Sequence, residues 1–330
     1  MASEMTVDPD LSAAKKSRVT GFIRIGLSIL ILITLASIFD IEDLLARIMS
    51  VSPWLWIGVF AVFLLGHAAA AAKWRLLIGV DTPYLRALQA HYAGLAANIA
   101  LPGVAGGDLV RAAIVMKGSN KKTALALGSL ADRLIDTSAL LIIAAFGALW
   151  LGARSGVDQT ALAVAGVFVV ISGAAAIALL RPVASMLRAK APGGKSGAII
   201  GDVASTLDDL AGRRSALFLC VALSIAIQLT FAIMNGLIAT NIGAGTSLAS
   251  WIFAWPLAKL IATLPLSFGG LGVREASIAG LMTPMGYEAS SVIAASLIWQ
   301  SVLYAGGATG VIVQSFALRH LGGNAGHSHG

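Results

Sequence analysis

A segment with two kinds of helix breaker and an arginine occurs twice in the chain. Leu101–Ala113 aligns without a gap with Leu264–Ala276, and seven of the thirteen pairs are identical. A chance pairing in so narrow a composition would give roughly one or two matches. Each copy has a proline, a glycine pair and an arginine within apolar sequence, where such residues are costly unless they line a polar cavity. The duplication therefore indicates a pathway through a membrane more than a chemical reaction.

The chemistry that this pattern favours is the binding of an oxygen-rich anion. Pro102 and Pro265 interrupt a helix, and the glycine pairs that follow permit a tight reversal with uncovered backbone N–H groups. Where the helix resumes, its N-terminus attracts an anion. Arg111 and Arg274 follow one turn later, and a guanidinium matches phosphate oxygens in a two-point contact. The glycines predicted to take part in binding are Gly106, Gly107, Gly269 and Gly270.

Acidic side chains accompany both arginines. Asp108 follows the first glycine pair, and Glu275 comes directly after Arg274. We expect each carboxylate either to hold its arginine or to compete with an anionic ligand, because ionisable groups at membrane depth need partners. The alternative is an ordinary turn with an arginine that reaches the interface, but an ordinary turn has no reason to repeat.

A further charged cluster opens the apolar run that follows the first copy. Asp132 and Asp136 share a helix face by their spacing, with Arg133 beside them. The cluster either lies at the water boundary or forms the wall of a cavity in which Arg133 binds phosphate. Lys259 precedes the second copy and adds a cation to the same predicted site. The polar residues expected to join helices through hydrogen bonds are Asn98, Gln228, Asn235 and Gln300.

The composition identifies a membrane protein. Hydrophobic residues make up 58% and charged residues 12%, and the mean hydropathy is +0.87, outside the range of soluble domains. We predict an all-α polytopic membrane protein, a single transmembrane domain over 1–330 with about six full transmembrane helices. The apolar runs long enough to cross a bilayer, about 20 residues each, are 19–39, 53–72, 134–152, 160–180, 216–240 and 289–318.

The positive charges predict the topology. If the N-terminal tail, 1–18, is cytoplasmic, then all but four of the 23 Lys and Arg residues lie on the cytoplasmic side. A basic loop at 181–215 and a flexible tail at 320–330 fall on that side too. The net charge of +7 therefore fits an anionic leaflet and does not require nucleic acid. The exceptions are Arg47, Arg154, Lys259 and Arg274.

Two broken segments, 84–117 and 251–286, interrupt the series of crossings. Three full crossings separate them, and an odd number means that they enter from opposite faces. The prediction is an inverted repeat of two re-entrant broken-helix segments, which is a common plan of transporters. A short helix lying in the membrane interface is predicted near 41–49, where apolar residues follow helical spacing.

Several of these residues together resemble a known family. They are Asn98–Pro102, Gly106–Asp108, Arg111, Asp132–Leu134, Asp136 and Pro265–Glu275. The family is the flippase-like one that includes the transmembrane domain of lysylphosphatidylglycerol synthases. The resemblance implies an inner-membrane bundle with two re-entrant segments that moves a lipid headgroup between leaflets. The chain resembles stand-alone members without an aminoacyl-transferase domain, because only a Gly- and His-rich tail follows Arg319. Related members accompany hopanoid, glycolipid and polyprenyl-phosphate pathways.

The leading hypothesis is flipping of an anionic or phosphate-bearing lipid headgroup between leaflets of the bacterial inner membrane, with both termini cytoplasmic. The expected partners are a phospholipid, hopanoid, glycolipid or polyprenyl-phosphate lipid, together with lipid-biosynthesis enzymes and a second copy of the chain. No cofactor, metal or nucleic acid is expected. One alternative is a lipid-modifying enzyme with Asp108, Asp132 or Glu275 as acid or base, although no metal-ligand spacing, Ser-His-Asp order or P-loop supports it. Another is a non-catalytic scaffold that recruits lipid-synthesis enzymes through 181–215.

Overall fold

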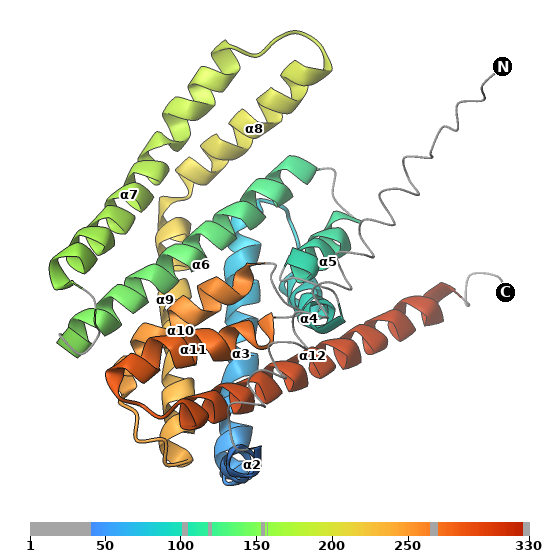
Figure 1. Cartoon of the computed structure of the whole chain (residues 1–330). Coiled ribbons are helices and arrows are strands. Elements are labelled where there is room, and N and C mark those ends of the chain that lie inside the picture. The colour runs from blue at the N-terminus through green and yellow to red at the C-terminus, as the bar shows by residue number, and fades with distance from the viewer. Residues whose placement is uncertain are drawn as a thin grey trace, which may run out of the picture.

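The computed structural model describes residues 41–100, 105–117, 121–152, 156, 158–264 and 270–325, and every regular element within them is a helix (Figure 1). This confirms the all-α prediction. In chain order the elements are α2 (Ile41–Met49), α3 (Pro53–Leu77), α4 (Tyr84–Ala100), α5 (Ala105–Met116), α6 (Lys122–Leu151), α7 (Gln159–Ala189), α8 (Lys195–Gly212), α9 (Arg214–Asn241), α10 (Leu248–Thr263), α11 (Val273–Met282), the 3-10 turn η3 (Thr283–Met285) and α12 (Ala289–Ala325).

In the described part of the chain, five helices are long and apolar enough to cross a membrane. They are α3, α6, α7, α9 and α12, and they correspond to five of the six predicted crossings. A helix suits these runs because it satisfies every backbone polar group within the segment, which a bilayer requires. The first predicted crossing, 19–39, lies outside the described residues. The chain is therefore a multi-pass membrane protein.

Both repeated segments interrupt a helix. Helix α4 ends at Ala100 and α5 begins at Ala105, while α10 ends at Thr263 and α11 begins at Val273. With 12 and 10 residues, α5 and α11 are too short to cross a bilayer, which needs about 20 residues. Each packs against the helix that precedes it. Each repeat therefore forms a helical hairpin; residues 101–104 and 265–269, which include both prolines, lie outside the described part.

Two glycines allow the arms of the first hairpin to approach closely. A Cβ atom added to Gly107 would lie 2.4 Å from the backbone oxygen of Gly94, and one added to Gly94 would lie 2.8 Å from the backbone oxygen of Gly107. The side chain of Asn98 fixes the same contact, because its Oδ1 accepts the Gly107 backbone N–H at 2.9 Å. Asn98 thus joins the two arms, as predicted for the buried polar residues.

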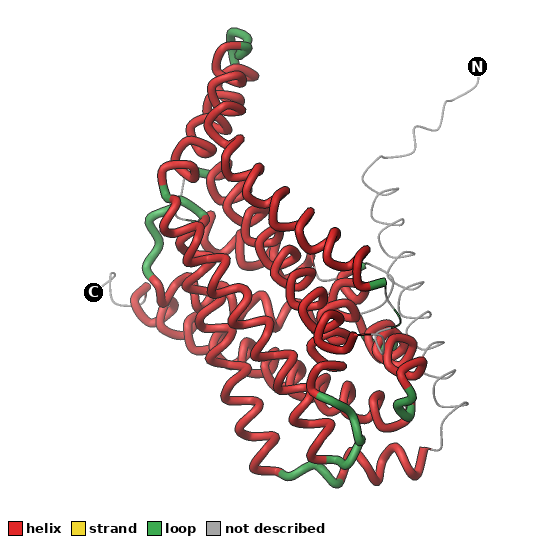
Figure 2. The backbone as a smooth tube through the Cα atoms, turned by 90° about the vertical axis from the view of Figure 1, so that its left-hand side faces the viewer, coloured by secondary structure: helices red, strands yellow, loops and turns green. Residues whose placement is uncertain are grey.

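The predicted basic loop is largely helical. Helix α7 continues to Ala189, and α8 covers most of the remainder, so that the two form a hairpin which extends beyond the rest of the bundle (Figures 1 and 2). Ala184 and Ala204 are fully buried, and Arg188 forms an ion pair with Asp208. The charged residues after 180 therefore do not mark the end of the helix, because its polar continuation packs against the amphipathic α8.

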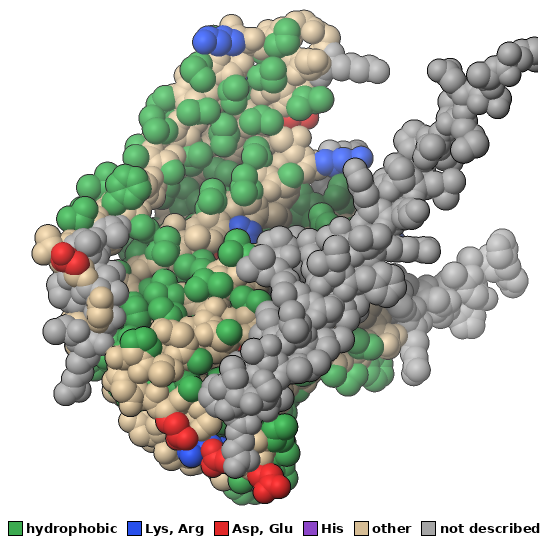
Figure 3. All heavy atoms as spheres, viewed as in Figure 1, with side chains coloured by type: hydrophobic (Ala, Val, Ile, Leu, Met, Phe, Trp, Pro, Cys, Tyr) green, Lys and Arg blue, Asp and Glu red, His purple; other side chains and the backbone are tan. Residues whose placement is uncertain are grey.

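Apolar side chains cover much of the outer surface, including the visible face of α7 and α8 (Figure 3). On α7, Val167, Phe168 and Ile171 are all more than half exposed. A soluble protein rarely exposes so large an apolar face. On a multi-pass membrane protein such a face contacts lipid.

The predicted interfacial segment at 41–49 is the helix α2, which packs on the start of α12. Arg47 lies 3.1 Å from Glu288 and 2.8 Å from Asp43. Hydrogen bonds from Ser290 and Ser291 to Glu288, with a smaller contribution from Arg47, lower the pKa of that carboxyl below its ordinary value. These polar contacts fasten α2 to the bundle.

Candidate functional site

A cavity of about 200 Å³ lies between the two helical hairpins. Both hairpins line it, the first through α4 and α5 and the second through α10 and α11, and α3, α6, α9 and α12 complete the wall. The two copies of the motif therefore face a shared space. The charged residues that line the cavity are Lys73, Asp108, Arg111, Asp132, Arg133, Asp136, Lys259 and Arg274.

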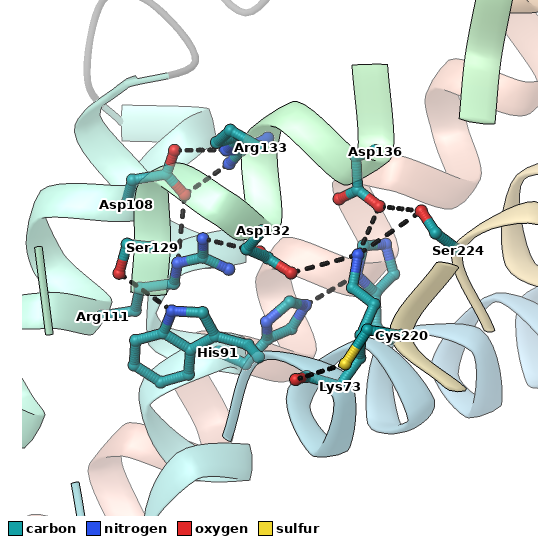
Figure 4. A network of polar contacts seen from close by, with 12 residues as sticks. Lys73, His91, Asp108, Arg111, Ser129, Asp132, Arg133, Asp136, Cys220 and Ser224 are labelled. Carbon is teal, nitrogen blue, oxygen red and sulfur yellow. Dashed lines mark hydrogen bonds and ion pairs between the residues drawn. The ribbon is translucent and has the colours of Figure 1, made fainter. Parts of the chain in front are cut away.

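Arg111 and Asp132 form the buried centre of the site. The guanidinium Nη2 of Arg111 donates to Oδ2 of Asp132 at 3.0 Å, and the two side chains are 5% and 3% exposed. The guanidinium also lies 4.8 Å from the ring centroid of Trp74, close enough for a cation–π contact. Helix α6 thus supplies the carboxylate that Arg111 of α5 needs at this depth (Figure 4).

Asp108 holds two arginines at the more open side of the site. Its carboxylate accepts hydrogen bonds from both Nε and Nη2 of Arg133, the former at 2.6 Å, and lies 3.1 Å from Nε of Arg111. The side chains of Arg133 and Asp108 are 42% and 27% exposed. Of the two roles expected for Asp108, holding its arginine or competing with an anionic ligand, these contacts match the first. Arg133 is likewise paired, through Nε and Nη2, so a phosphate could reach it without displacing Asp108 only from the Nη1 side of the guanidinium.

Lys73 belongs to the same network, although its position in the sequence predicted a cation at the cytoplasmic end of a crossing. Its side chain is 1% exposed and lies 3.1 Å from Asp132. It also donates to Asp136, which accepts a hydrogen bond from Ser224 of α9 (Figure 4). A lysine after an apolar run looks the same in sequence whether it reaches water or turns inward, so no local signal identified it.

The second hairpin contributes cations of a different kind. Nζ of Lys259 donates to Oε1 of Gln228 at 2.7 Å, and a guanidinium nitrogen of Arg274 donates to Oε1 of Gln300 at 2.6 Å. Neither cation has a carboxylate within 4 Å among the described residues. Lys259 also lies 5.1 Å from the ring centroid of Trp255. Their partners are therefore neutral amides and a ring, and their charges are not balanced by a direct partner.

Glu275 does not act as predicted. It is fully buried, and its carboxylate accepts the backbone N–H of Gly272 at 2.7 Å and the hydroxyl of Ser296 at 3.0 Å. The cause is its position in the third residue of α11, from which a glutamate reaches back to the start of its own helix. Glu275 therefore fastens α11 to α12 rather than holding Arg274 by a direct ion pair, and it is not among the residues that line the cavity.

The glycines of the motif take different places. Gly107 lines the cavity and Gly106 does not, while Gly270, at φ +76°, lies beside the guanidinium of Arg274. Gly269 lies outside the described residues. The backbone N–H groups of Gly107 and Gly272 bind Asn98 and Glu275. At Gly107 the expectation of an uncovered N–H donor is therefore wrong. Gly272 lies outside the two glycine pairs, and its N–H is also taken, by Glu275.

The cavity wall also contains a pair of histidines that were not predicted from the sequence. Nδ1 of His67 on α3 lies 3.0 Å from Nε2 of His91 on α4. Beside them, Phe63, Phe231 and Trp299 form part of an aromatic cluster that also lines the cavity. The two histidines are 24 positions apart within apolar sequence, and only the packing of α3 on α4 brings them together.

The hollow continues from the cavity between α6 and α10. Asp108, Arg133, Asp136 and Lys259 line both spaces, and Thr137 and Leu260 line the extension. Leu134, on the outer side of α6 next to Arg133, is 60% exposed. The charged site therefore lies close to an apolar outer surface.

The motifs and their placement agree with the comparison with protein families. Residues 21–310 match the model of the lysylphosphatidylglycerol synthase transmembrane region. The chain belongs to this family. The family indicates a membrane protein involved in lipid handling. No match was found among curated proteins.

Proposed function

We propose that this protein moves an anionic or phosphate-bearing lipid headgroup between the leaflets of the bacterial inner membrane. In this proposal the two hairpins are re-entrant, enter from opposite faces, and leave both termini in the cytoplasm. The protein would act as a transporter rather than an enzyme. The observation that carries the proposal is a cavity shared by the two hairpins in which cations outnumber carboxylates.

The charges explain which ligand this cavity favours. Lys73, Arg111 and Arg133 face Asp108, Asp132 and Asp136, so this network is neutral as a whole. Lys259 and Arg274 remain in excess. A buried cation without a counter-charge is costly, and an anion between these two side chains would reduce that cost. An anion can displace the amide oxygens of the two glutamines, whereas it would be repelled by the carboxylates of the network.

The size of the cavity supports a headgroup rather than a whole lipid. About 200 Å³ is below the 300–1,000 Å³ or so that encloses a drug-sized ligand. The acyl chains can stay in the bilayer because only the polar group meets a large cost in crossing hydrocarbon. The extension of the cavity between α6 and α10, next to an exposed apolar surface, would let a headgroup enter from the side.

Transport of a labelled lipid tests the proposal. Liposomes with the purified protein and fluorescent phosphatidylglycerol should exchange label between leaflets faster than protein-free liposomes. Lys259→Gln and Arg274→Gln should each slow exchange by roughly tenfold or more, since a hydrogen bond to a charged group contributes about 1.5–3 kcal/mol. Lys190→Gln, an exposed lysine at the end of α7, is the matched control.

Wild-type rates in the double variant Lys259→Gln/Arg274→Gln would refute the anion site. Mass spectrometry of the same lipids distinguishes the alternatives, because a new mass would favour a lipid-modifying enzyme. The same assay with a labelled glycolipid or polyprenyl phosphate would separate the lipid classes that the family leaves open.

A further inference from the structure

The two histidines in the cavity wall can hold one extra proton between them. The 3.0 Å contact joins Nδ1 of His67 to Nε2 of His91, so one of these nitrogens carries the hydrogen and the other accepts it. If both rings were fully protonated, two N–H groups would point at each other and the contact would break. Nδ1 of His91 is buried without a partner among the described residues. The pair therefore has an unsatisfied nitrogen and a capacity of one added proton.

The surroundings of the pair link that proton to the anion site. The charged groups that act on the two rings are Lys73 of α3, Arg111 of α5, Arg133 and Asp136 of α6, and Lys259 of α10. Four of these five are cations, and all five line the same cavity as the histidines. Lys259 is also one of the two cations between which the proposed anion binds, so an anion beside it offsets its charge and thereby favours a proton on the pair. Binding free energies are reciprocal, so a bound proton favours the anion equally.

Aromatic rings close one side of the pair. The ring centroid of His67 lies 4.3 Å from that of Phe63 and 5.6 Å from that of Phe231. These rings offer no hydrogen-bond acceptor to a protonated histidine. A cation–π contact with Phe63 can stabilise a protonated His67 only weakly. An anion in the cavity supplies the counter-charge that the rings lack, which makes the occupancy of the proton site sensitive to the ligand.

We propose that His67 and His91 form a proton-binding site through which the protein moves one proton together with each anionic headgroup. This rests on the proposed function, because the headgroup is the anion that completes the pair. The proton enters from the solution on the side where the headgroup binds, forms an N–H bond on the pair, and leaves to the solution on the other side. A headgroup of charge −1 and one proton cross as a neutral unit, so a pH gradient drives the movement and a membrane potential does not.

The test uses full-length protein in liposomes with fluorescent phosphatidylglycerol, the membrane potential being held at zero with potassium and valinomycin. With a gradient of one pH unit, one-to-one coupling should enrich the label up to tenfold in the leaflet on the alkaline side, and reversing the gradient should reverse the enrichment. Protein-free liposomes under the same gradient give the baseline. A potential applied without a pH gradient should leave the label evenly distributed.

Variants assign the effect to the pair. His67→Gln and His91→Gln should abolish the tenfold enrichment, whereas His327→Gln, a histidine outside the described residues, should keep it. Enrichment that persists in both cavity variants would overturn the assignment. Calorimetry provides a measurement that needs no variant. A short-chain phosphatidylglycerol is titrated into the wild-type protein in two buffers of different ionisation enthalpy, and the difference between the two binding enthalpies gives the number of protons taken up. We expect uptake approaching one proton per lipid bound; no uptake would overturn the coupling.

The outcomes separate this inference from the function on which it rests. If the wild-type protein does not move the label even without a gradient, the transport proposal fails. If it moves the label without a gradient but a pH gradient leaves the label evenly distributed, transport stands and proton coupling is refuted.

Discussion

Replacement of Asp132 by asparagine should destabilise the protein strongly. The carboxylate of Asp132 lies 3.0 Å from Arg111 and 3.1 Å from Lys73, and all three side chains are at most 5% exposed. At 3.0 Å and an effective dielectric constant of about 20, one such pair attracts by about 5.5 kcal/mol. Desolvation of the charges offsets part of this attraction, and breaking a buried ion pair typically costs about 3–5 kcal/mol.

Thermal unfolding in detergent measures the effect. Asp132→Asn should lower the midpoint by roughly 5–10 °C. The double variant Lys73→Met/Asp132→Asn restores equal numbers of cations and carboxylates in the network, and should recover part of the loss because contacting residues couple by about 0.5–3 kcal/mol. Asp202→Asn, at an exposed position of α8, should leave the midpoint unchanged. A single variant as stable as the wild type, or a double variant no more stable than the single one, would contradict the idea of a charge-balanced network.

Three further predictions concern other parts of the structure. Gly107→Ala should destabilise the first hairpin by about 1–3 kcal/mol through overpacking, measured by the unfolding midpoint, while Gly173→Ala, which meets nothing within 4 Å, should not. Glu288→Gln should lower the unfolding midpoint at pH 7, and the difference from the wild type should vanish on acidification. The pKa of Glu288 is lowered in the folded state, so the carboxylate stabilises the fold at pH values above its ordinary pKa of 4.5, and this stabilisation is lost as the pH falls through the pKa of the folded state. Leu271→Asp should slow lipid exchange in liposomes severalfold by neutralising Arg274, and Leu271→Asn should not; equal rates in the two variants would count against the excess-charge argument.

The membrane spans could be predicted from the sequence because they depend on local composition alone. A run of about 20 apolar residues must form a helix in a bilayer, and α9 follows the predicted 216–240 closely. The ends of helices were less predictable. Helix α7 continues past 180 because its polar extension packs against α8, and that contact joins residues that are distant in the sequence.

The residues of the site could largely be predicted from the sequence, but the ion pairs that they form could not. The repeat identified Arg111 and Arg274, and the spacing of Asp132 and Asp136 indicated a shared face, which the cavity confirms. The partner of a buried ion cannot be read from its neighbours in the sequence, however. Lys73 pairs across 59 positions with Asp132, and such pairings depend on how helices pack.

The difference between the two copies of the motif explains the division of charge in the cavity. The position after the second glycine is Asp108 in the first copy and Leu271 in the second. Asp108 lies against both Arg111 and Arg133, whereas among the described residues Arg274 has the amide of Gln300 as its one hydrogen-bond partner. Among the residues that line the cavity, the first hairpin thus contributes Asp108 and Arg111, which offset each other, and the second contributes Lys259 and Arg274 without a carboxylate. If both copies had kept the aspartate, the excess of positive charge would fall and the argument for an anionic headgroup would lose its main support. The asymmetry of the repeat, rather than its similarity, is what favours a ligand at the second hairpin.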